Sequence, residues 1–396
     1  MANWKTLMSN IKSSARFYWR AWLGCLCAVL AIAILASLVT ATYWQVSIKP
    51  RLEPKLSFLE KLLHQGGKFA LIGCDPHIHS VAENTRRLLL SSYEWHGQND
   101  LGSYWAIWRG GWLELDRLPP GTTPGEDWLT NGLMRFRHVC TVGFFDAAVT
   151  RNDIESFFVA CPNPHRLRFV GCRFEKGAFH SLIDRIPVET SLCLHRCEAA
   201  DAFRCDRTDA KKLHQLELVR IALKDMEWAE VFQRVAVREL LLGACRGIRE
   251  QGFAELSTMG SLRCLRILPD DEQEWEAWCR DTSVYSQITV LSYFAYQYPA
   301  PTKIMIKTAK CVPHVESLAI TVKHIDDHAL IYLQELRELQ ILQIQAEHIQ
   351  GDLGPVIRCE RLRSLIVRTR NPTRELRLTL DTLKGKGVDV QLLDWW

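Results

Sequence analysis

The chain has 396 residues, of which 47% are hydrophobic and 24% are charged, a composition typical of folded globular proteins with room for about two to three domains. Its formal net charge of +4 is too small to indicate a nucleic-acid partner, and no basic run with interleaved aromatic residues occurs. None of the 14 cysteines forms a Cys-x-x-Cys pair, so a zinc ribbon is not indicated.

The first predicted element is a single transmembrane helix at residues 21–46. No charged residue occurs from Ala21 to Ser47, and this apolar run is long enough to cross the roughly 30 Å hydrocarbon core of a bilayer. Residues 1–20 carry four basic residues and no acidic one. This bias predicts a cytoplasmic N-terminal tail at 1–20, with the rest of the chain outside the cell membrane. A signal peptide cleaved after Ala41 is the alternative.

Residues 47–135 are interpreted as a juxtamembrane and capping segment. We expect a short helix at 56–64 and a strand at Phe69–Ile72, at the edge of the sheet of the following domain. In Tyr104–Leu118, apolar runs flank Arg109-Gly110-Gly111, a pattern that predicts a β-hairpin. The tryptophans of this segment are expected to cap the next domain, or alternatively to form an aromatic contact surface for a partner or the membrane.

Within this segment, His77 and His79 stand just after the Phe69–Ile72 strand in FALIGCDPHIHS. Two histidines one residue apart can bind a divalent metal, as in barrel-shaped hydrolases. Such a barrel needs eight strand–helix units, and a catalytic zinc usually takes three protein ligands. Asp75-Pro76 equally predicts a turn. We therefore expect no metal, no cofactor and no enzymatic activity, with a metal-dependent hydrolase using His77 and His79 as the alternative.

An apolar pattern recurs from residue 136 to residue 396. The pattern is Leu-x-x-Leu-x-Leu with aliphatic replacements, and its second position falls at residues 139, 167, 192, 216, 240, 265, 288, 318, 339, 365 and 390. Alternating aliphatic residues indicate a short strand with one buried face. Stacked copies are expected to form an irregular α/β solenoid, with a curved parallel sheet and with helices or turns on its convex side. The long step after 288 predicts an inserted loop near Ala295–Pro313.

From Phe136 to its C-terminus the chain resembles the leucine-rich repeat proteins, and more closely the bacterial membrane-anchored members with an N-terminal transmembrane helix. The stretches VTRNDIESF (Val149–Phe157) and IDDHALIYL (Ile325–Leu333) are similar to a turn of that group. Gly66-Gly67-Lys68-Phe69 and the step from Pro124 to Trp128-Leu129 are also similar to features of these proteins. The resemblance implies a leucine-rich repeat solenoid with a binding function.

One position of the repeat departs from that family. The family often places Asn, Cys or Thr three residues after the last strand aliphatic. Cys172, Cys197 and Cys245 fit this rule and most of the other copies do not, so we expect an irregular solenoid. We interpret the three cysteines as a buried ladder, with a disulfide or a metal site as the alternative.

The candidate binding surface is the concave face of the predicted sheet. The residue after the final strand aliphatic should point outward, and this column reads Val142, Val170, His195, Val219, Gly243, Leu268, Leu291, Thr321, Leu342, Arg368 and Leu393. Most of these residues are aliphatic, and large exposed apolar patches are uncommon on inert monomers. We predict a hot spot at Val219, Leu268 and Leu291, flanked by Glu217 and Arg266, with Leu241 and Leu342 on the same surface. Coverage by loops, or the strand propensity of Val and Leu, is the alternative.

These expectations favour a membrane-anchored protein-binding module. We expect a protein partner on the concave face, membrane contact through residues 21–46, and no nucleic acid. No Ser-His-Asp set, phosphate loop or paired-carboxylate motif is evident. A structural envelope protein with no discrete ligand is the further alternative, since a fold does not fix a function.

Overall fold

The computed structural model describes residues 38–39, 42–43, 49–65, 68–72, 112–136, 139–199, 211–268, 272–295, 301–351 and 353–394. The predicted transmembrane helix at 21–46 lies outside these residues except at 38–39 and 42–43. None of the helices within the described ranges combines the length and the apolar character that a membrane span requires.

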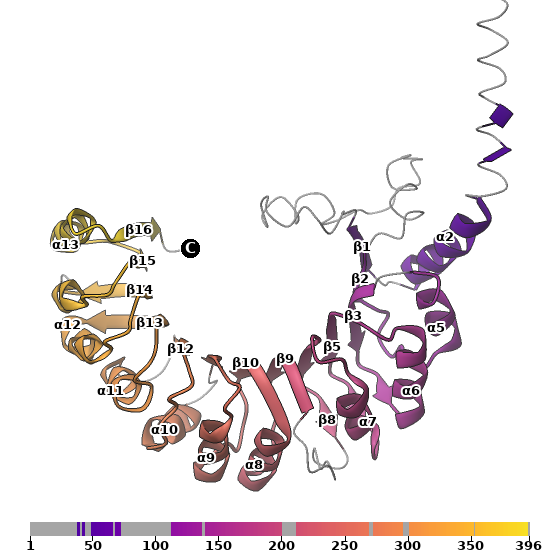
Figure 1. Cartoon of the computed structure of the whole chain (residues 1–396), viewed down its shortest axis with the longest axis horizontal. Helices are drawn as coiled ribbons and strands as arrows, with labels where there is room; N and C mark the ends of the chain where they lie inside the picture. The colour runs from indigo at the N-terminus through magenta and orange to yellow at the C-terminus, as the bar shows by residue number, and fades with distance from the viewer. Residues whose placement is uncertain are drawn as a thin grey trace, which may run out of the picture.

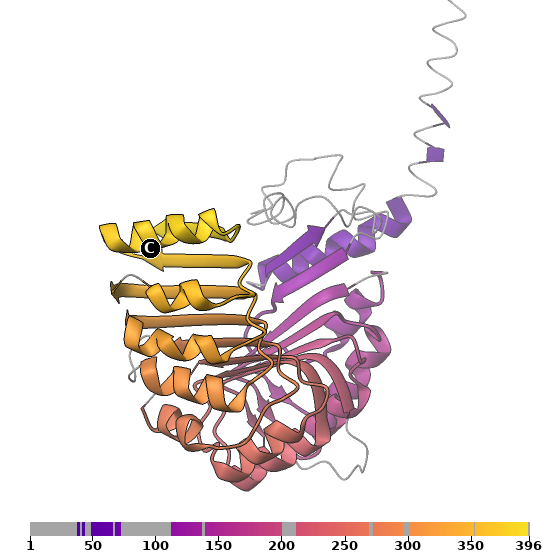
Figure 2. The ribbon, with the colours of Figure 1, turned by 60° about the vertical axis from the view of Figure 1, so that its left-hand side comes forward.

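The described chain forms a horseshoe whose inner layer is one long β-sheet and whose outer layer is helical (Figures 1 and 2). The sheet has 13 strands in the order β1-β2-β3-β5-β7-β9-β10-β11-β12-β13-β14-β15-β16. Only the β1–β2 pair is antiparallel. The strands are β1 Lys68–Ile72, β2 Trp112–Arg117, β3 Val139–Phe145, β5 Arg166–Val170, β7 Ser191–His195, β9 Lys211–Val219, β10 Val235–Gly243, β11 Cys264–Leu268, β12 Val290–Ala295, β13 Ser317–Asp326, β14 Ile341–Gln350, β15 Ser364–Thr369 and β16 Asp389–Asp394.

The outer layer contains α-helices in most repeats and 3₁₀ turns in two of them. Its elements are α2 Lys49–His64, α5 Asp127–Leu133, α6 Arg151–Ala160, α7 Ala178–Arg185, α8 Asp225–Arg234, α9 Glu250–Thr258, α10 Glu272–Arg280, α11 Pro301–Cys311, α12 Asp327–Leu330, η2 Ile331–Glu335, η3 Gly354–Arg358 and α13 Arg374–Gly385. This is an α/β fold with a long parallel sheet, which resembles a leucine-rich repeat solenoid as predicted.

A row of aliphatic side chains holds the sheet to the helices. Paired register places Val142, Leu167, Leu192, Leu216, Leu240, Leu265, Leu291, Leu318, Leu342, Leu365 and Val390 in one line across the strands. All but the last are buried. Burying one leucine stabilises the fold by about 1.5–3 kcal/mol, so this row is the main source of cohesion between neighbouring repeats.

This register corrects the predicted repeat at three strands. The sequence pattern used Val139, Ile288 and Leu339 as the second position, whereas the paired residues are Val142, Leu291 and Leu342, three residues later. In the observed register the steps range from 23 to 27 residues. The predicted insertion near Ala295–Pro313 is therefore wrong. Most of that stretch is helix α11, an ordinary member of the outer layer.

A recurring turn ends the strands in the N-terminal half. Asp146, Gly171, Arg196, Arg220 and Ala244 all have positive φ angles between 51° and 67°. Each donates its backbone N–H to the carbonyl at the end of the next strand; for example, Asp146 bonds Val170 and Arg220 bonds Gly243. A left-handed conformation costs a non-glycine residue roughly 1–3 kcal/mol, and this hydrogen bond with the packed turn offsets the cost.

The cysteine ladder lies directly behind these turns. Cys172, Cys197 and Cys245 are buried and donate thiol hydrogen bonds to Phe144, Phe169 and Leu218 respectively, with sulfur–oxygen distances of 3.6, 3.3 and 3.2 Å. The described cysteines are all free thiols. The interpretation as buried ladder residues is confirmed. Next to the ladder, the strands β4 Ala148–Val149, β6 Arg173–Phe174 and β8 Glu198–Ala199 form a second small sheet.

The N-terminal end of the solenoid is closed by α2, β1 and β2. The predicted helix at 56–64 falls within α2, and the predicted strand Phe69–Ile72 falls within β1. Phe58 of α2 packs against Trp128 and Phe136, with ring centroids 5.9 Å apart in both pairs. The predicted hairpin is wrong in its pairing, because the two neighbours of β2 are β1 and β3. The other arm of that hairpin lies outside the described residues.

A concave-face surface as the candidate functional site

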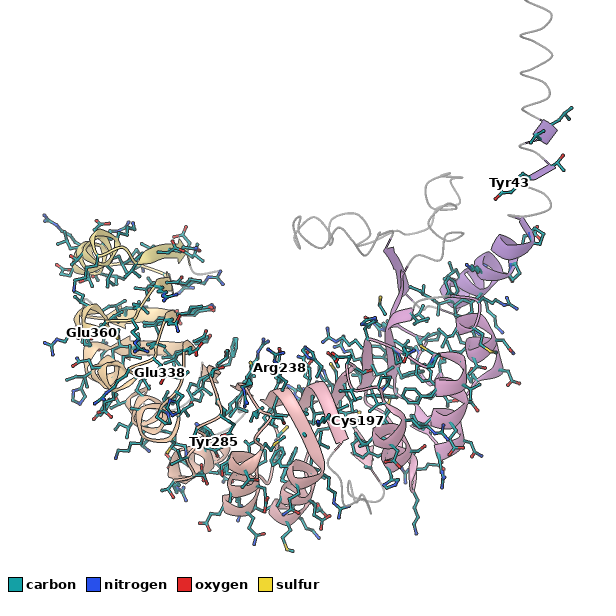
Figure 3. All side chains as sticks on the ribbon, viewed as in Figure 1. Tyr43, Cys197, Arg238, Tyr285, Glu338 and Glu360 are labelled. Carbon is teal, nitrogen blue, oxygen red and sulfur yellow. The ribbon has the colours of Figure 1, made fainter. Side chains whose placement is uncertain are left out.

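The face of the sheet that turns away from the helices lines the concavity of the horseshoe (Figure 3). Its residues alternate with the buried row, so two outward residues flank each buried one. Among the predicted site residues, Glu217, Val219, Leu241, Arg266 and Leu268 are outward, and all are at least partly exposed.

Two predicted site residues are wrong. Leu291 and Leu342 have no exposed surface, because they belong to the buried row between sheet and helices. A shift of three residues reverses the face of a strand, as any odd shift does. The outward residues of β12 are instead Ser292 and Phe294, and Phe294 is 45% exposed.

We define the apolar patch as Val219, Leu241, Leu268 and Phe294. The register runs Val219–Gly243–Leu268 in one row and Glu217–Leu241–Arg266 in the neighbouring row. Phe294 follows Tyr293, which pairs with Ile267, and so continues the first row beside Leu268. With strands about 4.8 Å apart, the patch extends about 14 Å across the sheet. The prediction missed Phe294 because alternation alone did not reveal which of Tyr293 and Phe294 faces inward.

Gly243 sits within this patch for a local reason. A β-carbon at this position would lie 3.2 Å from Val219 Cγ2, closer than ordinary van der Waals contact. The side chains of Val219 and Leu241 therefore cover the buried glycine, and a larger residue at this position would displace Val219. The glycine thus lets Val219 and Leu241 close over strand β10 and makes the apolar surface continuous there.

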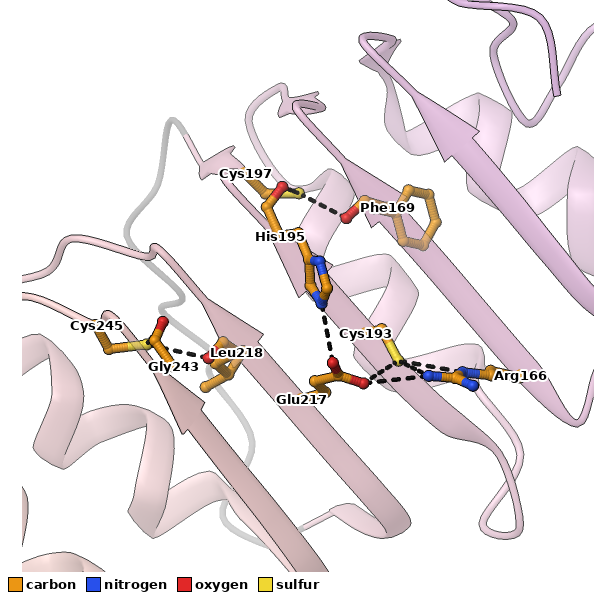
Figure 4. Close-up of polar contacts among 9 residues, drawn as sticks. All are labelled: Arg166, Phe169, Cys193, His195, Cys197, Glu217, Leu218, Gly243 and Cys245. Carbon is orange, nitrogen blue, oxygen red and sulfur yellow. Dashed lines mark hydrogen bonds and ion pairs between the residues drawn. The ribbon is translucent and has the colours of Figure 1, made fainter. Parts of the chain in front are cut away.

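A polar cluster borders the apolar patch on strands β5, β7 and β9 (Figure 4). We define it as Arg166, Cys193, His195 and Glu217. Arg166 Nη2 and Cys193 Sγ lie 3.2 and 3.0 Å from Glu217 Oε2. His195 Nε2 lies 3.1 Å from Glu217 Oε1, and Arg166 also donates to Cys193 Sγ at 3.4 Å. Since an ionised carboxylate only accepts hydrogen bonds, all three neighbours donate to Glu217.

The hydrogen bonds of the polar cluster keep the Glu217 carboxylate ionised. The hydrogen bond from His195, together with those from Cys193 and Arg166, lowers the pKa of Glu217 to about 2 against the opposing effect of burial. Burial, reinforced by the Glu217 carboxylate, raises the pKa of Cys193 to about 12. Cys193 is therefore a protonated thiol at neutral pH, and the thiolate is the form that acts as a nucleophile. The cluster can orient a ligand but is unsuited to cysteine catalysis.

The sequence placed His195 in an outward column but gave no sign that it meets Glu217. Arg166 and Glu217 are 51 residues apart in the chain, so only the stacking of β5, β7 and β9 brings them together.

A further aromatic contact lies toward the N-terminal end of the sheet. There, the Arg117 and Arg168 guanidinium carbons lie 5.4 and 5.9 Å from the Phe145 ring centroid.

The predicted alternative at His77 and His79 lies outside the described residues. Within the described ranges, no group of three or more His, Cys, Asp or Glu side chains is arranged to hold a metal ion. Whether the chain is an enzyme or takes a cofactor stays a prediction.

Comparisons with known proteins add little to this geometry. No protein-family model matches the chain, and no curated protein matches it. Among solved structures, a match is found to an internalin from Listeria monocytogenes, with 10% sequence identity and a TM-score of 0.35, covering 74% of this chain and 84% of the other. A likeness this distant carries no argument about function. The fold assignment rests on the observed strand order and register.

Proposed function

We propose that the chain is a membrane-anchored binding protein that captures a protein partner on its concave face. The apolar patch carries the proposal, because three of its four side chains are aliphatic residues on a sheet face where a purely solvated role would favour polar ones. A partner's apolar side chains would replace water over Val219, Leu268 and Phe294.

The polar cluster supports the same role. Interface hot spots combine packed apolar residues with charged groups that are already held in place, and arginine is enriched among them. Arg166 is half-exposed, while Glu217 is only 15% exposed. Arg166 thus has surface left for a partner, and its position is set by Glu217 and Cys193. A prearranged side chain loses less conformational entropy on binding.

Membrane anchoring through residues 21–46 belongs to the proposal on sequence grounds. The uncharged run and the basic residues before it support a cytoplasmic N-terminus and an extracytoplasmic solenoid. No partner other than protein, and no catalytic step, is included in the proposal.

The test compares matched pairs of variants. The full chain is used to capture partners from the native membrane, and each partner is identified, purified and titrated against the wild type. Leu268→Ser with Phe294→Ser should weaken binding by at least about tenfold, the change that corresponds to about 1.4 kcal/mol. The control replaces Val159 and Met226 on helices α6 and α8, which are 75% and 67% exposed on the convex side, with serine.

Equal affinity of the two double variants for the same partner would refute the concave site. Unchanged thermal unfolding in both variants is required, so that lost affinity reports the surface and not the fold.

A further inference from the structure

Two histidines form a stacked pair on strands β13 and β14, separate from the apolar patch and the polar cluster. His324 and His348 are directly paired across the parallel strands. Their ring centroids are 5.0 Å apart, and their planes are inclined by only 14°. Both residues are exposed, and the His348 side chain keeps 46% of its surface accessible.

We propose that His324 and His348 together bind a divalent transition-metal ion of the kind that prefers imidazole, such as zinc, nickel or copper. Imidazole nitrogen is a common ligand of these ions, whereas magnesium and calcium prefer oxygen ligands. The parallel register supplies the geometry, because identical positions on neighbouring strands lie about 4.8 Å apart. The solenoid thereby presents two imidazoles side by side from residues 24 positions apart.

Chelation requires the two rings to turn toward each other. Metal–nitrogen distances of about 2.0–2.1 Å in a tetrahedral site place two ligand nitrogens about 3.3 Å apart. The ring centroids are 5.0 Å apart and the planes are nearly parallel, so both rings must turn before one nitrogen of each points at a shared ion. Rotation about the χ angles of exposed residues provides this movement without a change in the backbone.

A carboxylate and a guanidinium lie near one end of the pair. Glu347 Oε1 lies 3.9 Å from His348 Nε2, and the same oxygen lies 2.9 Å from Arg370 Nη1. Glu347 is too far from His348 to hydrogen-bond it in this arrangement, and a turn of the His348 ring would be needed for the carboxylate to support it as a ligand. Arg370 holds this carboxylate on its other side. The site has two imidazole ligands, and its remaining positions are open to water or to a group from a ligand.

The experiment is a calorimetric titration of the tag-free full chain with nickel chloride and with zinc chloride, and with magnesium chloride as the negative control. The variants are His324→Ala and His348→Ala. Two controls test other histidines. One is the double variant of His77 and His79 to alanine, and the other is His314→Ala, an exposed histidine outside the pair. Thermal unfolding followed by circular dichroism verifies that every variant is folded.

The expected result is one nickel or zinc site in the wild type and in both controls, weakened at least about tenfold by either substitution within the pair. No magnesium binding should occur. The proposal is overturned if the wild type binds neither ion. It is also overturned if His324→Ala and His348→Ala both bind as tightly as the wild type, or if only the variant of His77 and His79 loses the ion. The last result would revive the hydrolase alternative.

Discussion

The substitution Leu291→Ala tests the observed register most directly, because the sequence pattern placed this side chain on the solvent face. Leu291 has no exposed surface and lies between Leu265 and Leu318 in the buried row. Removing three carbons loses about 2.4 kcal/mol of transfer free energy at about 0.8 kcal/mol each. The row is pinned by strands on both sides and cannot collapse freely, so a cavity term raises the expected loss to about 3–5 kcal/mol.

The matched control is Leu268→Ala, on the neighbouring strand but on the concave face, where the side chain is partly exposed. We expect it to cost less than about 1 kcal/mol, as is usual for partly exposed positions. Both variants are compared with the wild type by urea unfolding followed by circular dichroism, with attention to an unchanged slope. A loss below about 1 kcal/mol for Leu291→Ala, with a larger loss for Leu268→Ala, would show that the sequence-based register was correct and the observed one is not.

Three further predictions concern the polar cluster, a buried ion pair and the N-terminal segment. Glu217→Gln should remove a stabilisation of about 2 kcal/mol at pH 7, allowing for screening at half-exposed Arg166. Because the pKa of Glu217 is lowered to about 2, the wild type should lose this stabilisation as the pH falls from about 4.5 to about 2. Urea unfolding between pH 7 and 3 should therefore show a smaller difference between variant and wild type at the acid end, and a constant difference would contradict the assignment. Lys307→Met should cost about 3–5 kcal/mol, since Lys307 and Asp281 lie 2.6 Å apart with side chains only 2% and 5% exposed. Asp281 also accepts from the hydroxyl of Tyr285, labelled in Figure 3, and an unchanged melting temperature in that variant would show that water reaches the pair. Deleting residues 1–47 should leave a soluble folded domain, and aggregation of that chain while the full chain in detergent stays folded would show that the repeats need the membrane.

Much of the repeat architecture could be predicted because its signal is local. Alternation within strands, a spacing near 25 residues and the apolar faces of the intervening helices together indicate stacked strand–helix units, and nothing distant is needed to recognise them. The ladder cysteines were interpretable for the same reason, since Cys172 and Cys197 each occupy a fixed offset from their own strand.

The candidate site could be predicted only in part. Val219, Leu241 and Leu268 were placed correctly on the concave face, because in their strands the second position of the pattern, at Leu216, Leu240 and Leu265, is the residue that pairs across the sheet. Leu291 and Leu342 were not, because each is preceded three residues earlier by another buried aliphatic residue, Ile288 and Leu339 respectively.

By itself the sequence determined that short strands and helices alternate and that most strands bury one aliphatic face, because these properties depend on neighbours within a few residues. Only the tertiary structure decided which face Leu291, Phe294 and Leu342 occupy. The first two aliphatic positions of the Leu-x-x-Leu-x-Leu pattern are both buried, and from the sequence either could be the residue that pairs with the neighbouring strand. The tertiary structure also decided which polar groups meet. Arg166, Cys193 and Glu217 come from three successive strands, and their contact depends on register between strands, which no local pattern in the chain specifies.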